Sequence, residues 1–330
     1  MAEADTKVGL LTRAEGLAYW AAVAPLAARL PGWLAYRVAC WRGDLTRRLW
    51  PQKRAEIVRD VRRVLGDEVS EEAAEHLARE LFRFRSCDIM DVMRLHGSAR
   101  SLTRLVEIRG REHLDAALAA GKGALLCTGH IGSHQSAFSV VNASGYPLTT
   151  MGRWDWKYDT SISPVERRFW NFVLARRVLR HRKRPNIEPW PGRIQVAVQT
   201  AAALRANELV TICSDAAPLR AERAGIVEMP FLGRQARLMP GVVTLAKLTG
   251  APVLMAFVHR TPDYRHQVLE ISPPVPMDGD TDTAFAHCAA AIEAAIKAHP
   301  AHWNFWFEED VLARLGVLRG AAPIEAAAET

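Results

Sequence analysis

The sequence is poor in cysteine, and its cysteines are not arranged to cross-link the chain or to bind a metal. The five residues are scattered and form no C-x-x-C pair; they are Cys40, Cys87, Cys127, Cys213 and Cys288. This spacing supports neither a disulfide framework nor a zinc ribbon. We therefore expect free thiols in a reducing compartment.

Other absences bear on targeting signals, membrane spans and domain boundaries. Acidic residues stand at the extreme N-terminus, where a secretory signal would carry basic ones. The longest uncharged run of this region spans residues 16–28, whereas a helix that crosses a bilayer needs about 20 apolar residues. Proline-rich linkers, Gly/Ser-rich linkers and internal repeats are also missing. We expect no secretory signal, no transmembrane segment and one integrated domain with a helical extension.

The composition is that of a soluble globular protein with a basic surface. Of the 330 residues, 49% are hydrophobic and 24% are charged, which excludes a wholly disordered chain, a collagen and a disulfide-stapled miniprotein. Lys and Arg outnumber Asp and Glu by 43 to 36, a formal net charge of +7. Such a balance favours acidic partners: phospholipid head groups, nucleic acid, an acidic carrier protein or a phosphorylated substrate.

The first hundred residues predict a helical extension that associates with a membrane surface, which we place at residues 1–104. Residues 16–41 are apolar, rich in tryptophan and interrupted by arginines, as in segments that lie in a bilayer interface. The same pattern fits two core helices broken at Pro31. Further along, Ser70 is a plausible helix N-cap, and apolar side chains recur after it at helical spacing.

From residue 105 to about 318, apolar strands alternate with helices. Strands are predicted at 106–110, 123–129, 209–215, 252–260 and 264–272, with helices at 111–123 (ending in a glycine-flanked turn), 193–207, 241–249 and 283–298. This alternation predicts an α/β fold, with a central, mostly parallel sheet flanked by helices. The alanine-rich segment 319–330 is expected to be a flexible tail.

The segment GALLCTGHIGSHQS carries the chemistry. A buried strand ends at Gly129 and delivers His130 to the carboxyl edge of the sheet, where ligands bind in open α/β folds. A histidine there can act as a general base towards a hydroxyl group, because its ordinary pKa lies near neutrality. A structural histidine would fit the residues of this segment equally well.

Five blocks in order resemble the bacterial lipid A biosynthesis acyltransferases (lauroyl and myristoyl transferases) and their relatives that acylate phosphatidylinositol mannosides. The blocks are GREHLDAALAAGKGALLCTGHIGSHQ, Arg168, the strand that ends in Asp215, PFLGRQARLMPGVVTLAKLTGAPVLMAF and HPAHWNFWF. These enzymes belong to the glycerolipid acyltransferase superfamily, whose hallmark is His-x-x-x-x-Asp/Glu. The resemblance covers about residues 106–310, with a weaker echo in the N-terminal helices.

The resemblance implies transfer of a fatty acyl group from an acyl thioester to a hydroxyl or amine of a glycolipid-type acceptor, with His130 as general base. The donor would be acyl carrier protein or coenzyme A, acting as a co-substrate, and no cofactor or metal is expected. Arg168 would orient the reacting groups. The substrate-binding set would comprise Asp215 (near a sugar hydroxyl), Gly233, Arg234, Arg237, Glu208 and Arg153. The enzyme would work peripherally at the cytoplasmic side of the inner or plasma membrane.

The hallmark itself departs from the family, because Gln135 stands where the family has the acid. Glutamine accepts a hydrogen bond but supplies no charge, and replacing the acid of a serine-protease triad by its amide costs about 10⁴ in rate. Three explanations are open: a better nucleophile such as an amine, a substitute acid such as Asp155, or a non-catalytic descendant that binds a lipid or a partner. Transfer to a specialised-metabolite acceptor is a further alternative.

Two features have competing interpretations. Residues 175–184 are dense in arginine and predict contact with phosphate on a phosphopantetheine arm, a carrier protein or a lipid head group, or else a solvated surface. They lack nucleic-acid-binding patterns, so we expect no nucleic-acid partner. His130 and His134 have the spacing of two zinc ligands, but Ile131 occupies the glutamate position of H-E-x-x-H and no third ligand is evident.

Overall fold

The computed structural model describes residues 10–66, 69–95, 103–152, 186–187, 193–216 and 225–318. Its centre is a six-stranded sheet in the order β1-β8-β7-β2-β4-β3. The strands are β1 (Val106–Arg109), β2 (Ala124–Thr128), β3 (Leu148–Thr150), β4 (Leu209–Cys213), β7 (Val253–Arg260) and β8 (Gln267–Pro274). All neighbours in this sheet run parallel except β7 and β8. The predicted α/β fold with a mostly parallel sheet is confirmed.

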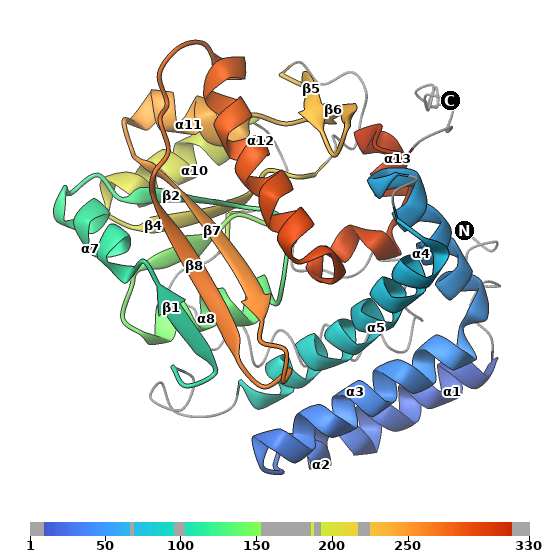
Figure 1. The fold of residues 1–330 in the computed structure, drawn as a ribbon. Coiled ribbons are helices and arrows are strands. Elements are labelled where there is room, and N and C mark those ends of the chain that lie inside the picture. The colour runs from blue at the N-terminus through green and yellow to red at the C-terminus, as the bar shows by residue number, and fades with distance from the viewer. Residues whose placement is uncertain are drawn as a thin grey trace.

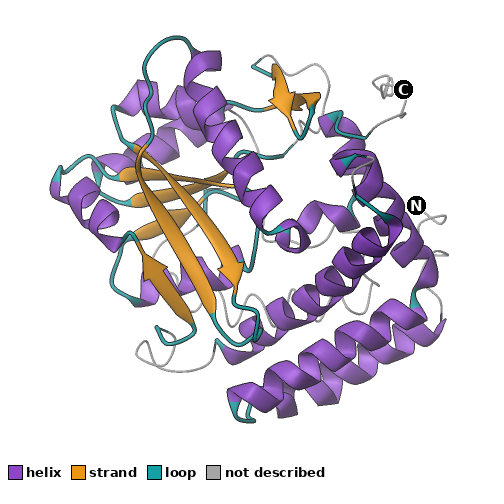
Figure 2. Ribbon diagram, viewed as in Figure 1, coloured by secondary structure: helices purple, strands orange, loops and turns teal. Residues whose placement is uncertain are grey.

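Helices cover both faces of this sheet (Figures 1 and 2). They are α7 (Arg111–Ala119), α8 (His134–Ala143), α10 (Arg193–Arg205), α11 (Gly241–Thr249) and α12 (Thr281–Ala298), while the short α13 (Glu309–Leu315) lies beside the hairpin strand Arg234–Leu238. The strand β2 shows why two layers are needed. Leu125 and Cys127 enter one hydrophobic core, with α11 and α12, while Ala124 and Leu126 enter the other, with α7 and α8. A strand buried on both faces reads as a continuous apolar run.

The N-terminal helices form a separate layer along one side of the molecule (Figure 1). They are α1 (Leu10–Ala18), α2 (Ala24–Ala27), α3 (Gly32–Leu49), α4 (Pro51–Leu65) and α5 (Glu71–Arg94), with a π-helical turn at Tyr19–Val23. The Ser70 hydroxyl accepts a hydrogen bond from the Ala73 amide at 3.1 Å, so the predicted N-cap is confirmed. Among the described residues, no helix has the length and apolar character needed to cross a membrane.

The long helix α5 joins this layer to the sheet. Its first half, including Leu77 and Leu81, belongs to the core shared with α11 and α12, and its second half, including Ile89 and Met90, belongs to the other core. Helix α3 packs against the outer side of α5 through its small, buried residues Ala35, Ala39 and Gly43. A stripe of small residues lets two helix backbones approach closely.

The structure also contains strands that the sequence pattern does not predict. Strand β3 and the antiparallel hairpin of β5 (Val227–Phe231) and β6 (Arg234–Leu238) were not predicted. Both elements are short, and the edge strand β3 has only three residues, too few for a recognisable period. All five cysteines are free, as expected. The predicted tail 319–330 lies outside the described residues.

The close contact of α3 with α5 predicts a large effect of one methyl group. A Cβ atom at position 43 would lie 2.7 Å from the backbone of Phe82 and Arg83. We expect Gly43→Ala to lower the free energy of unfolding by about 1–3 kcal/mol, although alanine favours helices. Gly241→Ala is the control, because a Cβ there meets nothing within 4 Å. Urea unfolding measures both, and equal stability of the two variants would contradict the predicted clash.

Candidate active site

The site lies in the turn between β2 and α8, at the carboxyl end of the sheet. Gly129 follows β2 where space is tight, because a Cβ atom there would lie 2.9 Å from a carboxylate oxygen of Asp215. His130 comes next and leads into the turn. Since β2 and β4 are parallel neighbours, their carboxyl ends bring His130 and Asp215 to the same edge.

His130 and Asp215 form a hydrogen-bonded pair. The ring nitrogen Nδ1 of His130 lies 2.7 Å from Oδ1 of Asp215, and the His130 amide donates to Oδ2 at 2.7 Å. The indole Nε1 of Trp303 donates to the same Oδ2 at 3.0 Å. The Asp215 side chain is 0% exposed, while 31% of the His130 side chain is exposed. The carboxylate is therefore buried behind an imidazole that solvent or a substrate can reach.

The segment HPAHWNFWF wraps this turn from the C-terminal side. The Asn304 amide donates to the carbonyl of His130, and the Gly132 amide donates to the carbonyl of His302, each at 2.9 Å. The ring of Phe305 lies against the His130 imidazole, with centroids 4.5 Å apart. These contacts leave the His130 ring little freedom to rotate away from Asp215.

Gly132 is the position where the turn needs glycine. Its φ is +70°, and a Cβ atom there would lie 2.1 Å from the carbonyl oxygen of Val258 in β7. Both the left-handed backbone and the lack of space exclude other residues. The turn is thus pressed directly onto the neighbouring strand.

The charges of the pair support each other. Burial lowers the pKa of His130, but the negative charge and the hydrogen bond of Asp215 outweigh it, so the pKa is raised above 6.5. Burial alone would raise the pKa of Asp215, but the charge and the hydrogen bonds of His130 hold it below its ordinary value. With Nδ1 bonded to a carboxylate, Nε2 of the neutral ring carries the lone pair. This arrangement suits a general base with an acid that orients it.

Gln135 does not take the place of the hallmark acid against Nδ1. It lies in the first turn of α8, where its backbone carbonyl accepts a hydrogen bond from Ser139 at 2.8 Å. Within the described residues, no hydrogen bond joins its side chain to His130, whose Nδ1 is bonded to Asp215. The acid that accompanies the histidine therefore comes from β4 rather than from α8.

Two acids of the expected substrate-binding set are hydrogen-bonded within the protein. Asp215, expected near a sugar hydroxyl, has a buried carboxylate whose oxygens accept hydrogen bonds from His130 and Trp303. Glu208 precedes β4, at the end of the strand opposite Asp215. Its carboxylate is buried and accepts a hydrogen bond from Thr149 at 2.7 Å. The parallel strand separates Glu208 from the edge that carries His130.

The remaining predicted residues fall into two groups. Gly233, Arg234 and Arg237 lie in the β5–β6 hairpin, whose turn is tied to α12 by a hydrogen bond from the Leu232 amide to Glu293. Arg237 is paired with Glu228 at 3.8 Å. Among the described residues, no hydrogen bond or ion pair joins the hairpin to His130. Arg153, Arg168, the suggested substitute acid Asp155 and the basic segment 175–184 lie outside the described residues.

His134, the second histidine of the turn, lies beside His130. The rings of His130 and His134 meet edge to face, with centroids 5.8 Å apart. Across the described part of the chain, no group of three or more His, Cys, Asp or Glu side chains is placed to hold a metal ion.

Sequence reasoning missed the polar groups that support the turn from below. Trp303 and Ser133 stood in two of the family blocks without an assigned role. Asp91 and Arg260 were not considered at all, because one lies in a charged helix and the other at a strand end, 169 positions apart. Burial of charged side chains is the signal that reveals them, and only the structure supplies it.

Comparison with known proteins identifies the family of this chain. The profile of the bacterial lipid A biosynthesis acyltransferases matches residues 5–310. The chain belongs to this family. The resemblance stated from the sequence is therefore confirmed.

Two curated relatives lie in the mannoside-acylating branch. A phosphatidylinositol mannoside acyltransferase of Mycobacterium tuberculosis (strain CDC 1551 / Oshkosh) is 29% identical over 230 residues, 68% of this chain and 64% of the relative. The protein of the same description from strain ATCC 25618 / H37Rv is 29% identical over 210 residues, 62% of this chain and 60% of the relative. The chain thus spans less than two thirds of the length of these relatives.

The coupling of His130 to Asp215 predicts the titration of this family member. In Asp215→Asn the negative charge is gone while burial remains, so the pKa of His130 falls from above 6.5 to below it. Glu208→Gln, the same change at the other end of β4, leaves the His130 pKa unchanged. NMR titration of the His130 ring protons measures all three proteins. A His130 pKa that is the same in Asp215→Asn and wild type would contradict the coupling.

Proposed function

We propose that this protein transfers a fatty acyl group from an acyl thioester to a hydroxyl group of a glycolipid-type acceptor. The observation that carries the proposal is the buried Asp215 carboxylate bonded to Nδ1 of a partly exposed His130, in a chain of an acyltransferase family. The relatives act, by their descriptions, on phosphatidylinositol mannosides. An acceptor with sugar hydroxyls is the substrate class nearest to theirs.

In the proposed reaction, Nε2 of His130 removes the proton of the acceptor hydroxyl as its oxygen attacks the thioester carbonyl. Asp215 stabilises the imidazolium that forms and keeps the ring in the tautomer with a proton on Nδ1. The tetrahedral intermediate then collapses, the carbon–sulfur bond breaks, and the imidazolium returns the proton to the leaving thiolate. The products are an acyl ester and a free thiol, and His130 is neutral again.

The Asp215 carboxylate also bears on Gln135. A general base without an acid partner would favour a silent descendant of the family, and this is what the amide at position 135 suggested. Asp215 supplies the missing charge at 2.7 Å from Nδ1. This contact supports a catalytic protein over a silent lipid-binding one, and it removes the need for an amine nucleophile.

The donor is proposed to be a thioester of acyl carrier protein or of coenzyme A. Both carry a phosphopantetheine arm, and acyl carrier proteins are acidic, which the basic balance of +7 would attract. No cofactor enters the proposed reaction, since the thioester provides the activated acyl group.

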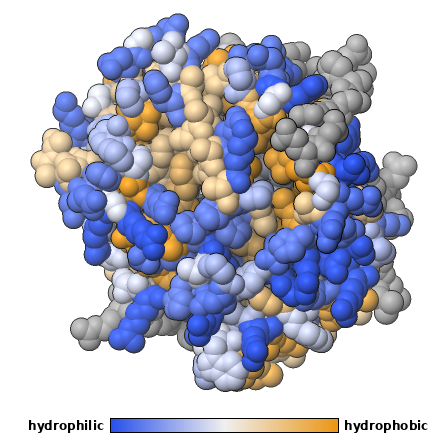
Figure 3. Space-filling model, viewed as in Figure 1, coloured by the Kyte–Doolittle hydropathy of each residue, from blue (hydrophilic) through white to orange (hydrophobic). Residues whose placement is uncertain are grey.

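We further propose that the outer face of α1–α3 rests on a membrane surface, peripherally and on the cytoplasmic side. Trp33 and Trp41 are 51% and 62% exposed, with the exposed Arg37 midway between them at helical spacing. Leu17, Leu26 and Leu30 are exposed on α1, α2 and the turn that follows. Figure 3 shows apolar and hydrophilic side chains side by side along the edge formed by α2 and α3. Tryptophan with neighbouring arginine is typical of segments at head-group level.

Acyl transfer tests the proposed chemistry. Purified protein is incubated with palmitoyl-acyl carrier protein or palmitoyl-CoA and a bacterial lipid extract, and mass spectrometry follows acylated lipids. We expect His130→Ala to abolish the product and Asp215→Asn to lower the rate by about 10²- to 10⁴-fold, by analogy with a catalytic triad. Wild-type activity should rise with pH to a half-maximum above pH 6.5, because only neutral His130 accepts a proton.

The matched control is Glu208→Gln, which exchanges a buried carboxyl for an amide at the far end of the same strand. We expect it to keep most of the activity. Equal losses in Asp215→Asn and Glu208→Gln would mean that Asp215 serves folding alone. No product from either donor, with folded wild-type protein, would overturn the acyltransferase proposal.

Vesicle binding tests the membrane face. We expect Trp33→Ser/Trp41→Ser to lower binding to phosphatidylglycerol-containing vesicles by at least about tenfold, because two tryptophan side chains no longer enter the interface. The control Ile194→Ser/Val198→Ser removes exposed apolar side chains from α10, which are 82% and 62% exposed, and should bind like wild type. Cosedimentation measures the bound fraction. Equal losses in both variants would refute a specific docking face on α1–α3.

A further inference from the structure

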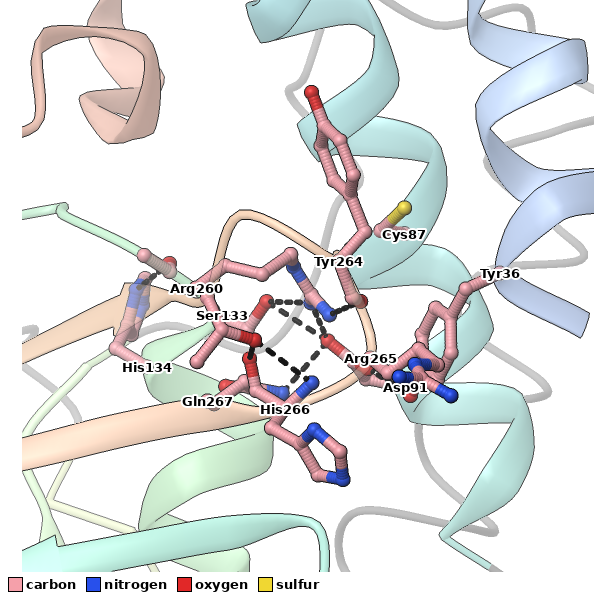
Figure 4. Close-up of polar contacts among 12 residues, drawn as sticks. Tyr36, Cys87, Asp91, Ser133, His134, Arg260, Tyr264, Arg265, His266 and Gln267 are labelled. Carbon is pink, nitrogen blue, oxygen red and sulfur yellow. Dashed lines mark hydrogen bonds and ion pairs between the residues drawn. The ribbon is translucent and has the colours of Figure 1, made fainter. Parts of the chain in front are cut away.

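A second buried carboxylate lies beneath the catalytic turn. Asp91, near the end of α5, accepts a hydrogen bond from the Tyr36 hydroxyl of α3 on Oδ1 at 2.6 Å. Its Oδ2 accepts from Ser133 at 3.0 Å and from Gln267 of β8 at 2.7 Å. Figure 4 shows these three side chains around Asp91, from α3, from the turn before α8 and from β8. The carboxylate therefore joins the N-terminal layer, the sheet and the turn that carries His130.

Arg260, the last residue of β7, supplies the opposite charge. Its Nη2 donates both to Asp91 and to Ser133 Oγ, the latter at 3.0 Å, and its Nη1 donates to the carbonyl of Tyr264 at 2.8 Å. The side chains of Asp91 and Arg260 are each 1% exposed. A buried ion pair costs desolvation and repays it only through good geometry and further hydrogen bonds. Such a network is rigid and fixes the groups it contains.

Ser133 gives the clearest sign of what this network does. It occupies the N-cap position of α8, where a serine hydroxyl ordinarily accepts a hydrogen bond from its own helix. Here the side chain makes no capping bond. Instead, the Ser133 hydroxyl donates a hydrogen bond to Asp91 and accepts one from Arg260. The Ser133 side chain therefore does not cap α8 but links the turn to the buried ion pair of Asp91 and Arg260.

The turn from His130 to Ser133 is then held on three sides. Asp215 binds the His130 amide and ring, and the segment around Trp303 binds the backbone of His130 and Gly132. Asp91 and Arg260 bind Ser133, three residues after His130. The third contact is the one that holds the side chain of the last turn residue, Ser133, at the entry to α8.

We propose that Asp91 is a positioning residue for His130, acting through Ser133, with Arg260 as its counter-ion. The inference rests on the proposed function and extends it, because it names what keeps the base at the correct distance from its substrate. It also assigns a role in catalysis to α5 of the N-terminal layer. A displacement of about 1 Å at a reacting group can cost 10²-fold in rate.

The test uses two variants, each of which removes one hydroxyl group that donates a hydrogen bond to Asp91. Ser133→Ala removes the link to the turn, and Tyr36→Phe removes the link to α3. Replacing Asp91 itself would remove the carboxylate that is paired with the buried Arg260 and endanger folding, so these milder changes are preferred. Tyr36→Phe is a demanding control, because it also removes a hydrogen bond to the buried carboxylate. Tyr36 donates to Oδ1 of Asp91, whereas Oδ2 has three donors. Thermal unfolding shows how far each variant is destabilised.

We expect Ser133→Ala to lower kcat by about 10- to 100-fold with KM unchanged, and to shift or broaden the NMR signal of the His130 Nδ1 proton. Tyr36→Phe should keep kcat within about twofold of wild type, with the same His130 signal. Similar losses of kcat in both variants would reduce Asp91 to a structural role, and unchanged kcat and His130 signal in Ser133→Ala would overturn the proposal.

The two readouts separate this proposal from the proposed function. If wild-type protein shows no acyl transfer, the proposed function fails, and the His130 signal in the two variants still decides whether Asp91 positions the ring. If wild-type protein is active and Ser133→Ala matches it in both readouts, only the positioning role fails.

Discussion

The buried carboxylate of Asp215 is the interaction on which the site depends. A charge removed from water is tolerated only when it is paired and hydrogen-bonded, and Asp215 obtains this from the ring and amide of His130 and from the indole of Trp303. These requirements are met because β4 lies beside β2, because position 129 carries no side chain, and because Trp303 reaches the carboxylate. The contacts that satisfy the carboxylate are the same contacts that orient the histidine.

The same physical rule operates a second time below the turn, at Asp91. There the carboxylate is balanced by Arg260 and by hydroxyl and amide donors from α3, the turn and β8. The N-terminal layer is consequently more than a covering of the core. Its long helix α5 enters both hydrophobic cores and ends at the buried ion pair. In the proposed function one layer both faces the lipid surface and supports the base.

The departure at Gln135 illustrates how a family motif and a chemical requirement differ. The proposed reaction needs a negative charge against Nδ1 of the histidine, and it does not need that charge to come from α8. The first turn of α8 and the end of β4 both lie next to the same imidazole, because the parallel strands β2 and β4 end at one edge. An acid on β4 thus meets the requirement while position 135 is an amide.

The sequence by itself determined the local structure and the family. The positions of β1, β2, α11 and the Ser70 cap follow from patterns within a few residues, because backbone propensity and side-chain periodicity act at short range. The partners of the charged groups could not be obtained this way: His130 and Asp215 are 85 positions apart, and Asp91 and Arg260 are 169. Only the order of strands in the sheet and the packing of α5 across it bring these groups together. Glu208 and Asp215 flank the same strand, but only the tertiary structure shows that Asp215 meets His130 and that Glu208 meets Thr149.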